Sequence, residues 1–269
     1  MRNSRRQNRQ MRKFSHFSVL LWREMSISKR QEQILELLGN NGFLSVSKIS
    51  DLTYTSESSV RRDLRALANQ SLITRTHGGA SANSDPHRPI PLINRMTRNI
   101  SAKKKIAKKA SVFIRDGMSV MLDGSSTAGF LVPYIAKHTG ITLFTNNMNT
   151  AISAIGYGIN TVCIGGRAVN NSAVLSGVEA YEALSNIHAD ILFFSSQTLS
   201  ENGTISDPIP EENYIRKLMI KCSDFSVFLC DGEKIGEESL YTLTNLKNVD
   251  AAVFDEIPER LSSVSKTMV

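Results

Sequence analysis

The stretch from Ser45 to Ala80 constrains the fold of this chain more than any other part of the sequence. It contains a short segment with helical apolar spacing, a tight turn, a second helical segment rich in hydroxyls and arginines, and a basic hairpin. Apolar residues at helical spacing favour helices that bury one stripe against their own domain. Two short helices followed by a hairpin, in this order, predict a winged helix-turn-helix.

The second helical segment, residues 56–70, separates apolar from polar side chains. Ser56 is a suitable N-cap, and three apolar residues recur at spacings of four and three on one inward face: Val60, Leu64 and Leu67. The remaining surface carries the side chains that we expect to enter a DNA groove: Ser58, Ser59, Arg61, Arg62 and Arg65. Arginine bonds guanine bidentately, and serine reaches bases or phosphates. A solvated helix face is the simpler alternative for Arg61, Arg62 and Asp63.

The flanking segments complete this domain. Residues 29–38 have the pattern of an amphipathic helix, and two glycines within residues 39–42 end it. A short second helix is predicted from three apolar residues: Val46, Ile49 and Leu52. Apolar and polar side chains tend to alternate in residues 72–76, which predicts a strand that ends before a pair of glycines. We expect this strand to belong to a wing from which Arg75 and His77 contact the DNA backbone.

Residues 28–80 resemble the DNA-binding domain of the DeoR family of bacterial transcription regulators. The family signature S-x-x-[ST]-[VI]-R-R-D-L matches residues 56–64, and its H-G-G-A matches residues 77–80. The resemblance implies that a double-stranded DNA operator is the partner. One departure is Tyr54, which stands where the turn usually carries a glycine. If that position requires a positive φ, a tyrosine there is strained.

Basic charge is concentrated in the first half of the chain, whose total net charge is +7. Residues 1–24 hold seven Lys and Arg against one acidic residue, and residues 81–116 hold nine against two. Residues 117–269 hold nine against seventeen and are therefore acidic. Neutralisation of DNA phosphates is expected only from the first half.

Residues 1–24 are expected to form a disordered basic extension. Their apolar stretch is too short for a signal peptide and lacks a small-residue cleavage site. A basic arm that follows a phosphate backbone and a mis-set translation start are two alternatives for this segment. The other expected parts are a winged helix-turn-helix domain at residues 25–80, a linker at 81–94, an α/β domain at 95–257 and a tail at 258–269.

The cysteines and the lack of long apolar runs predict a cytoplasmic protein. The three cysteines have no metal-ligand spacing and lie in apolar contexts, so we expect buried reduced thiols at Cys163, Cys222 and Cys230. No apolar run approaches about 18 residues, so no membrane span is expected. We also expect no metal and no cofactor.

The second half of the chain changes to short apolar strands separated by helices. Three prolines make residues 81–91 an extended connector, and residues 95–114 then predict one basic amphipathic helix with its lysines in solvent or against phosphate. Six strands are predicted, at residues 119–122, 141–144, 161–164, 191–194, 225–229 and 251–254. This alternation predicts an α/β domain with a mainly parallel sheet, which binds ligands beyond the carboxyl ends of its strands.

Polar residues that follow several of these strands predict a site for a phosphorylated sugar. Hydroxyls and helix N-terminal amides after the first strand suit a phosphate, and Lys234 after the fifth adds a cation. Neutral groups and glycines after the second and third strands suit the sugar. The predicted set is Asp123, Gly124, Ser125, Ser126, Thr127, Thr145, Asn146, Gly165, Gly166, Arg167 and Lys234. An ordinary turn is the alternative for each segment taken alone.

Nearly all of residues 95–255 resemble the C-terminal sensor domain of the DeoR family, which is similar in fold to ribose-5-phosphate isomerase. The family patterns match at Asp123–Thr127, Thr145-Asn146, Gly165–Arg167, Arg216–Ile220 and Asp231–Gly236. After the fourth strand many relatives read G-x-D-G, whereas this chain has residues Ser195 to Thr198, S-S-Q-T. The effector of another family member is therefore not transferred to this chain.

These features together predict a DNA-binding transcriptional regulator, a repressor of a carbohydrate-use operon that a phosphorylated sugar releases. One winged helix buries little surface, so we expect a homo-oligomer, a dimer or tetramer, on repeated half-sites. We expect no catalysis; the rival interpretation is an isomerase-like enzyme, with candidate carboxylates by residue type only at Asp123, Asp207, Glu211 and Glu212. A protein-interaction module is the third alternative.

Overall fold

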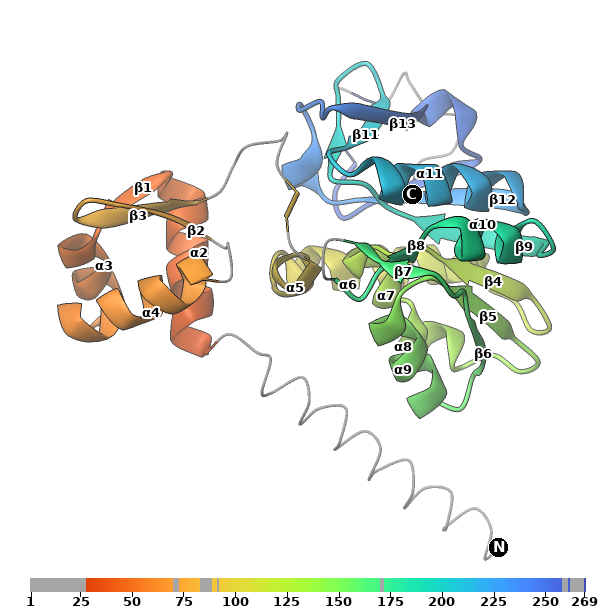
Figure 1. Ribbon diagram of the computed structural model, residues 1–269, viewed down its shortest axis with the longest axis horizontal. Coiled ribbons are helices and arrows are strands. Elements are labelled where there is room, and N and C mark those ends of the chain that lie inside the picture. Colours follow the sequence, from red (N-terminus) through yellow and green to blue (C-terminus); the bar gives the residue numbers. More distant parts are fainter. Residues whose placement is uncertain are drawn as a thin grey trace, which may run out of the picture.

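The computed structural model describes residues 28–69, 73–82, 89–90, 92–169, 172–257, 261 and 269. The predicted extension at residues 1–24 lies outside the described residues, as do parts of the predicted linker and tail. Figure 1 shows an N-terminal domain of helices with a small sheet and a larger domain built around a wider sheet. The predicted fold class is confirmed, because a winged helix-turn-helix is followed by an α/β domain with a parallel sheet.

The N-terminal domain packs its helices against a three-stranded antiparallel sheet. Its elements are α2 (Lys29–Asn41), β1 (Phe43–Ser45), α3 (Val46–Thr53), α4 (Glu57–Asn69), β2 (Ile73–Thr76) and β3 (Gly79–Ala82). The strand order is β1-β3-β2, and β2 and β3 form the wing. The predicted apolar stripe of α4 is buried in one core with residues of α2 and α3.

Serine side chains cap the starts of all three helices. Ser28 and Gln31 form a capping box at α2, and the Ser45 hydroxyl accepts a hydrogen bond from the Lys48 amide at α3. The predicted N-cap of α4 is confirmed, since the Ser56 hydroxyl accepts a hydrogen bond from the Ser59 amide at 3.4 Å. These bonds satisfy amides that would otherwise lack partners in the first turn.

Asp63 joins α4 to α2. Its side chain is buried and accepts hydrogen bonds from Arg30 Nε at 2.5 Å and Gln31 Nε2 at 3.2 Å. The hydrogen bond from Arg30 to Asp63 raises the pKa of the arginine. A solvated face is therefore the wrong interpretation of Asp63, because the carboxylate holds two helices together.

Two backbone positions define the turn and the wing. Tyr54 lies in the left-handed region at φ 51 and ψ 42, and its side chain is 97% exposed. A Cβ atom at Gly79 would collide with the carbonyl oxygen of Leu44. The close pairing of β1 with β3 therefore requires glycine at that position.

Two helices replace the single helix predicted at residues 95–114. Helix α5 spans Leu92–Thr97 and α6 spans Ile100–Ala110, followed by a 3-10 turn at Ser111–Phe113. The chain breaks at Asn99, whose backbone is left-handed with φ 53. Asparagine adopts this conformation more readily than most residues. The prediction of one continuous helix is wrong for this reason.

The larger domain contains a six-stranded parallel sheet. Its strands are β4 (Ser119–Leu122), β5 (Thr142–Thr145), β6 (Asn160–Cys163), β9 (Ala189–Phe194), β12 (Ser223–Cys230) and β14 (Ala251–Phe254). The order is β14-β12-β9-β4-β5-β6, and every neighbouring pair is parallel. All six predicted strands are confirmed, with small shifts at their ends.

Helices cover both faces of this sheet (Figure 1). One face packs against α6, α7 (Ser126–Gly129), α8 (Val132–Ile135) and α9 (Met148–Gly156), and the other against α10 (Val178–Leu184) and α11 (Pro210–Lys221). Smaller sheets pair β7 (Arg167–Ala168) with β8 (Leu175–Ser176), and join β10 (Thr198–Leu199), β11 (Thr204–Asp207) and β13 (Tyr241–Asn245). Short 3-10 turns lie at Gly232–Lys234 and Leu246–Asn248.

The three cysteines do not share one environment. Cys230 is buried and Cys222 is half-buried, but Cys163 is exposed, so the prediction of a buried thiol is wrong there. Cys163 is the last residue of β6. This strand lies at the edge of the sheet and pairs with one neighbour, β5. Within the described residues, no helix has the length and apolarity needed to cross a membrane. The same residues contain no group of three side chains suited to a metal ion.

Candidate DNA-reading surface and anion pocket

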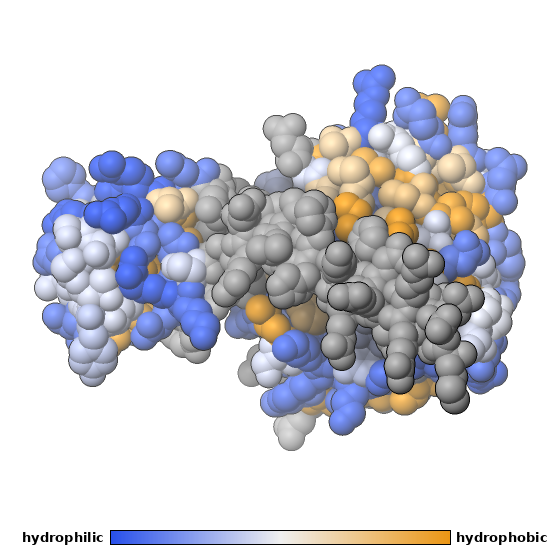
Figure 2. Space-filling model, turned by 90° about the horizontal axis from the view of Figure 1, so that it is seen from below, coloured by the Kyte–Doolittle hydropathy of each residue, from blue (hydrophilic) through white to orange (hydrophobic). Residues whose placement is uncertain are grey.

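Helix α4 presents the groups predicted for DNA contact on its outer side. Four of the predicted residues are exposed and the last is half-buried: Ser58, Arg61, Arg62, Arg65 and Ser59. Arg61 forms a 3.0 Å ion pair with Glu57, and both side chains are about half-exposed. An exposed ion pair contributes about 0 to 1 kcal/mol, so Glu57 does not prevent Arg61 from binding a base or phosphate. The face of this domain visible in Figure 2 is mainly hydrophilic.

The wing carries the other two predicted contacts. Arg75 lies in β2 and His77 in the turn to β3, and both are exposed. The Val46 amide donates a hydrogen bond to the Gly78 carbonyl at 2.8 Å. This bond fixes the tip of the wing to the start of α3.

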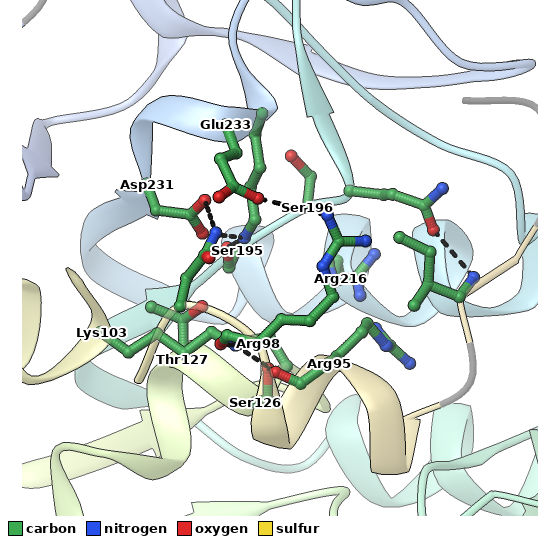
Figure 3. Close-up of a pocket in the computed structure, with 15 residues that line it drawn as sticks. Arg95, Arg98, Lys103, Ser126, Thr127, Ser195, Ser196, Arg216, Asp231 and Glu233 are labelled. Atoms are coloured by element: carbon green, nitrogen blue, oxygen red, sulfur yellow. Dashed lines mark hydrogen bonds and ion pairs between the residues drawn. The ribbon is translucent and has the colours of Figure 1, made fainter. Parts of the chain in front are cut away.

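A pocket opens at the carboxyl ends of β4, β9 and β12, three adjacent strands at the centre of the sheet. About 590 Å³ of space, part of it open solvent, lies between its lining residues. Five cationic side chains line it: Arg95, Arg98, Lys103, Arg216 and Lys234. The hydroxyls in its lining belong to Ser125, Ser126, Thr127, Ser195 and Ser196. Figure 3 labels most of these side chains around the pocket, together with Asp231 and Glu233.

Lys103 is a buried cation whose ammonium group hydrogen-bonds only to main-chain carbonyls among the described residues. It is 3% exposed and donates to the carbonyl of Arg95 and, at 2.6 Å, to that of Arg98. Burial, and then the charge of Lys234, lowers the pKa of Lys103 to about 7. The prediction that the lysines of this segment face solvent is therefore wrong for Lys103. A buried ammonium without a bonded carboxylate favours the binding of an anion.

Lys234 reaches the same space from the turn after β12. Its Nζ donates to Ser195 Oγ at 2.9 Å and lies 3.4 Å from Asp231 Oδ2. Burial alone would raise the pKa of Asp231, but Lys234 and Lys103 outweigh it and hold that pKa below its ordinary value. In this part of the pocket, the single carboxylate of Asp231 lies near two lysines, Lys103 and Lys234.

Arg216 joins three carboxylates beneath the pocket. It is 1% exposed, and it donates to Asp123 at 2.7 Å, Asp207 at 2.9 Å and Glu212 at 2.6 Å. Burial opposes its charge, but the three carboxylates keep the pKa of Arg216 above its ordinary value. Arg95 binds Glu212 through both terminal nitrogens, at 3.2 and 3.0 Å. These carboxylates serve the fold of the pocket floor.

Two buried polar atoms of the lining, Arg95 Nε and Thr127 Oγ1, lack a hydrogen-bond partner among the described residues. Thr127 is 1% exposed. Buried polar groups in folded proteins are nearly always paired. Both atoms can donate a hydrogen bond, so they suit a ligand that is rich in acceptor oxygens.

The pocket brings together only part of the predicted effector set. Ser125, Ser126, Thr127 and Lys234 line it, and Asp123 lies beneath it on Arg216. The others do not line it: Gly124, Thr145, Asn146, Gly165, Gly166 and Arg167. Strands β5 and β6 extend the sheet on the side of β4 away from β9 and β12, which separates their loops from the pocket.

The contribution of helix N-terminal amides stays a prediction, and α7 has only four residues. Several of the side chains that line the pocket were not predicted. Arg95, Arg98 and Lys103 precede the first strand, so a rule that searches after strand ends does not find them. Arg216 lies in a family motif, and its role becomes visible only with its three partners.

Comparison with known proteins agrees with both halves of the structure. Residues 30–85 match the DeoR-like helix-turn-helix domain, and residues 98–256 match the DeoR C terminal sensor domain. The HTH-type transcriptional regulator GolR of Listeria innocua is 30% identical over 84% of this chain and 90% of its own length. The lactose phosphotransferase system repressor of Staphylococcus aureus is 27% identical over 91% of this chain and 98% of its own.

Structural neighbours include ribose-5-phosphate isomerase from Methanocaldococcus jannaschii, with a TM-score of 0.39 and 19% identity over 51% of this chain and 55% of the enzyme. The first match covers α4 and the wing, and the second covers all residues that line the pocket except Ile90 and Arg95. The chain belongs to the DeoR family of DNA-binding transcriptional regulators.

Proposed function

We propose that this protein represses a carbohydrate-use operon and that a phosphorylated sugar in the sensor pocket controls its binding to DNA. The observation that carries the effector proposal is the buried ammonium of Lys103, which bonds main-chain carbonyls and no carboxylate within the described residues. The unpaired hydroxyl of Thr127 beside it supports an acceptor-rich ligand. The similarity to the lactose phosphotransferase system repressor of Staphylococcus aureus supports control by a sugar.

The proposed DNA contacts divide between α4 and the wing. Ser58, Ser59, Arg61, Arg62 and Arg65 enter the groove, where arginine reads guanine. Arg75 and His77 contact the backbone, which positions the helix without reading sequence. The protein acts as a homo-oligomer in the cytoplasm, because specific recognition by one small winged helix needs a second half-site.

The enzyme interpretation is the less supported alternative. Of its candidate carboxylates, Asp123, Asp207 and Glu212 are engaged by the Arg216 guanidinium. Glu211 is exposed and does not line the pocket. A general base must reach the proton that it removes, so these residues favour binding without turnover.

Fluorescence anisotropy with labelled DNA from upstream of the chain's own operon tests the proposal. A panel of sugar phosphates should contain a compound that weakens DNA binding at least tenfold, whereas the matching unphosphorylated sugar should have no effect. Release by the unphosphorylated sugar alone would contradict the role of the cationic pocket. Conversion of any bound sugar phosphate to its isomer, followed by NMR, would restore the enzyme interpretation.

A further inference from the structure

Most of the described polar contacts between the α5 segment, residues Leu92–Asn99, and the rest of the sensor domain reach residues that line the pocket. Its hydrogen bonds and ion pairs join Arg95 O to Ser126 Oγ at 3.0 Å, Arg95 to Glu212 at 3.0 Å, Arg98 to Glu233 at 3.2 Å, Asn99 to Asp231 at 3.0 Å and Met96 Sδ to Asn149 at 3.8 Å. Lys103 adds hydrogen bonds to the carbonyls of Arg95 and Arg98. The segment is thus one wall of the pocket.

The two unpaired donors belong to two different elements that line the pocket. Arg95 Nε belongs to the α5 segment, and Thr127 Oγ1 belongs to α7 at the end of β4. One phosphate has enough acceptor oxygens to bind both. A ligand that binds both donors links the segment to the sheet through bonds that the free protein does not make.

The segment is also the first described helix after the residues that join the two domains. Just before it, the Ile90 amide donates to Gln197 Oε1 at 3.2 Å, and both residues line the pocket. At its far end Asn99 is held in a left-handed conformation by its bond to Asp231. A non-glycine residue in this conformation is a strained position that its surroundings must stabilise.

We propose that a phosphorylated ligand pins the α5 segment onto the sensor domain through Arg95 and Thr127, and that this segment transmits occupancy of the pocket to the DNA-binding domain. The inference rests on the proposed function. Binding and seating of the segment are then thermodynamically coupled, so each favours the other. The ligand restricts the motion of the chain that leads to the winged helix. The side chains of α4 and of the wing that are proposed to contact DNA are left unchanged.

Hydrogen exchange of the full chain, measured by mass spectrometry, tests the pinning directly. The probes are inorganic phosphate and a series of hexose phosphates, with binding measured in parallel by calorimetry. At saturation we expect amide exchange in residues 92–99 to slow at least tenfold, while exchange in α10, which packs on the other face of the sheet and does not line the pocket, stays unchanged. Ligand binding without slower exchange in residues 92–99 would overturn the inference and leave the proposed function intact. Failure of every probe to bind would overturn both.

A pair of variants tests the role of the unpaired hydroxyl. Thr127→Val removes a hydroxyl that makes no bond in the described structure, so we expect the domain to remain folded and ligand affinity to fall about tenfold. Thr127→Ser keeps the hydroxyl and should retain most of the affinity and the protection of residues 92–99. Equal affinity and equal protection in both variants would exclude Thr127 from the pinning contact.

Discussion

At the scale of single residues, Lys103 links the sensor to pH. Its ammonium faces Arg95 and Arg98 of the α5 segment and Lys234 and Asp231 of the turn after β12, and its pKa lies at about 7. Below pH 7 the lysine is charged before the ligand arrives, whereas above pH 7 a proton must be taken up on binding. The affinity for a phosphorylated sugar should therefore fall by up to about tenfold per pH unit between pH 7 and 9.

Calorimetry across this range, repeated in buffers of different ionisation enthalpy, measures both the affinity and the proton uptake. Lys103→Met should bind more weakly at pH 7 and show no loss of affinity at higher pH. If the wild-type affinity is constant from pH 7 to 9, the ammonium of Lys103 does not contact the ligand.

Tyr54 stores conformational strain in the helix-turn-helix. The residue is left-handed, and its side chain is 97% exposed, so replacing it removes almost no packing. Tyr54→Gly should raise the free energy of unfolding by about 1 kcal/mol, because glycine adopts this conformation without steric cost. Urea denaturation of the full chain, followed in the transition of the N-terminal domain, measures this change.

Tyr54→Phe is the matched control, since it keeps the Cβ atom and loses only the hydroxyl. Its stability should equal that of the wild type. A loss of stability in Tyr54→Gly would mean that the tyrosine makes a favourable contact that offsets its backbone strain.

At the scale of the elements, one side of α4 packs in the core of its domain and the opposite side carries the arginines that are proposed to contact DNA. Arg62→Ala should weaken operator binding by about 1 to 3 kcal/mol, roughly 5- to 150-fold, and leave the melting temperature unchanged, because the side chain is exposed. Anisotropy with operator DNA and a thermal melt measure the two quantities. Arg115→Ala, which removes an exposed arginine of the sensor domain, controls for the loss of one positive charge.

Two neighbouring residues of α4 differ in role, since Arg62 is exposed and Asp63 is buried against α2. Asp63→Ala should lower stability by about 1 to 2 kcal/mol, because it leaves the Arg30 and Gln31 donors without their buried acceptor. An Arg62→Ala variant that melts earlier but binds DNA normally would show that the assignment of the two sides is reversed.

Elements with local determinants could be predicted from the sequence. The stripe of Val60, Leu64 and Leu67 repeats within one helix, and each strand of the large sheet is a short apolar run, so their patterns are complete within a few residues. The break at Asn99 depends on a single backbone conformation and interrupts no apolar pattern. Periodicity alone therefore merged α5 with α6.

The pocket was predicted only in part, because its geometry depends on the order of strands in space. Strand β9 lies between β4 and β12, so the residues that follow these three adjacent strands, among them Ser125 and Lys234, line one pocket. Asn146 and Arg167 follow β5 and β6 on the far side of β4 and do not line it. The inward direction of Lys103 depends on carbonyls that become available where α5 ends. Neither the strand order nor the direction of the Lys103 side chain can be predicted from the spacing of residues along the chain.

At the scale of the whole molecule, the small size of the winged helix predicts that more than one copy binds the DNA. Two half-sites whose separation is a near-multiple of about 10.5 bp place both copies on the same side of the duplex. Inserting 5 bp between the half-sites should weaken binding at least tenfold, and inserting 10 bp should restore it. Anisotropy on the three DNAs, with light scattering of the free protein, measures spacing and oligomeric state together. Affinity that is indifferent to spacing would indicate independent monomers.

The strand order of the large sheet also determines when the two halves of the molecule become functional during synthesis. The winged helix is complete at Ala82, but the sheet cannot close around β9 until β12 has been made, which ends at Cys230. At about 5 to 20 residues per second, this interval lasts roughly 7 to 30 s. A chain still on the ribosome thus has a complete winged helix before it has the strands on which the pocket of the larger domain is built.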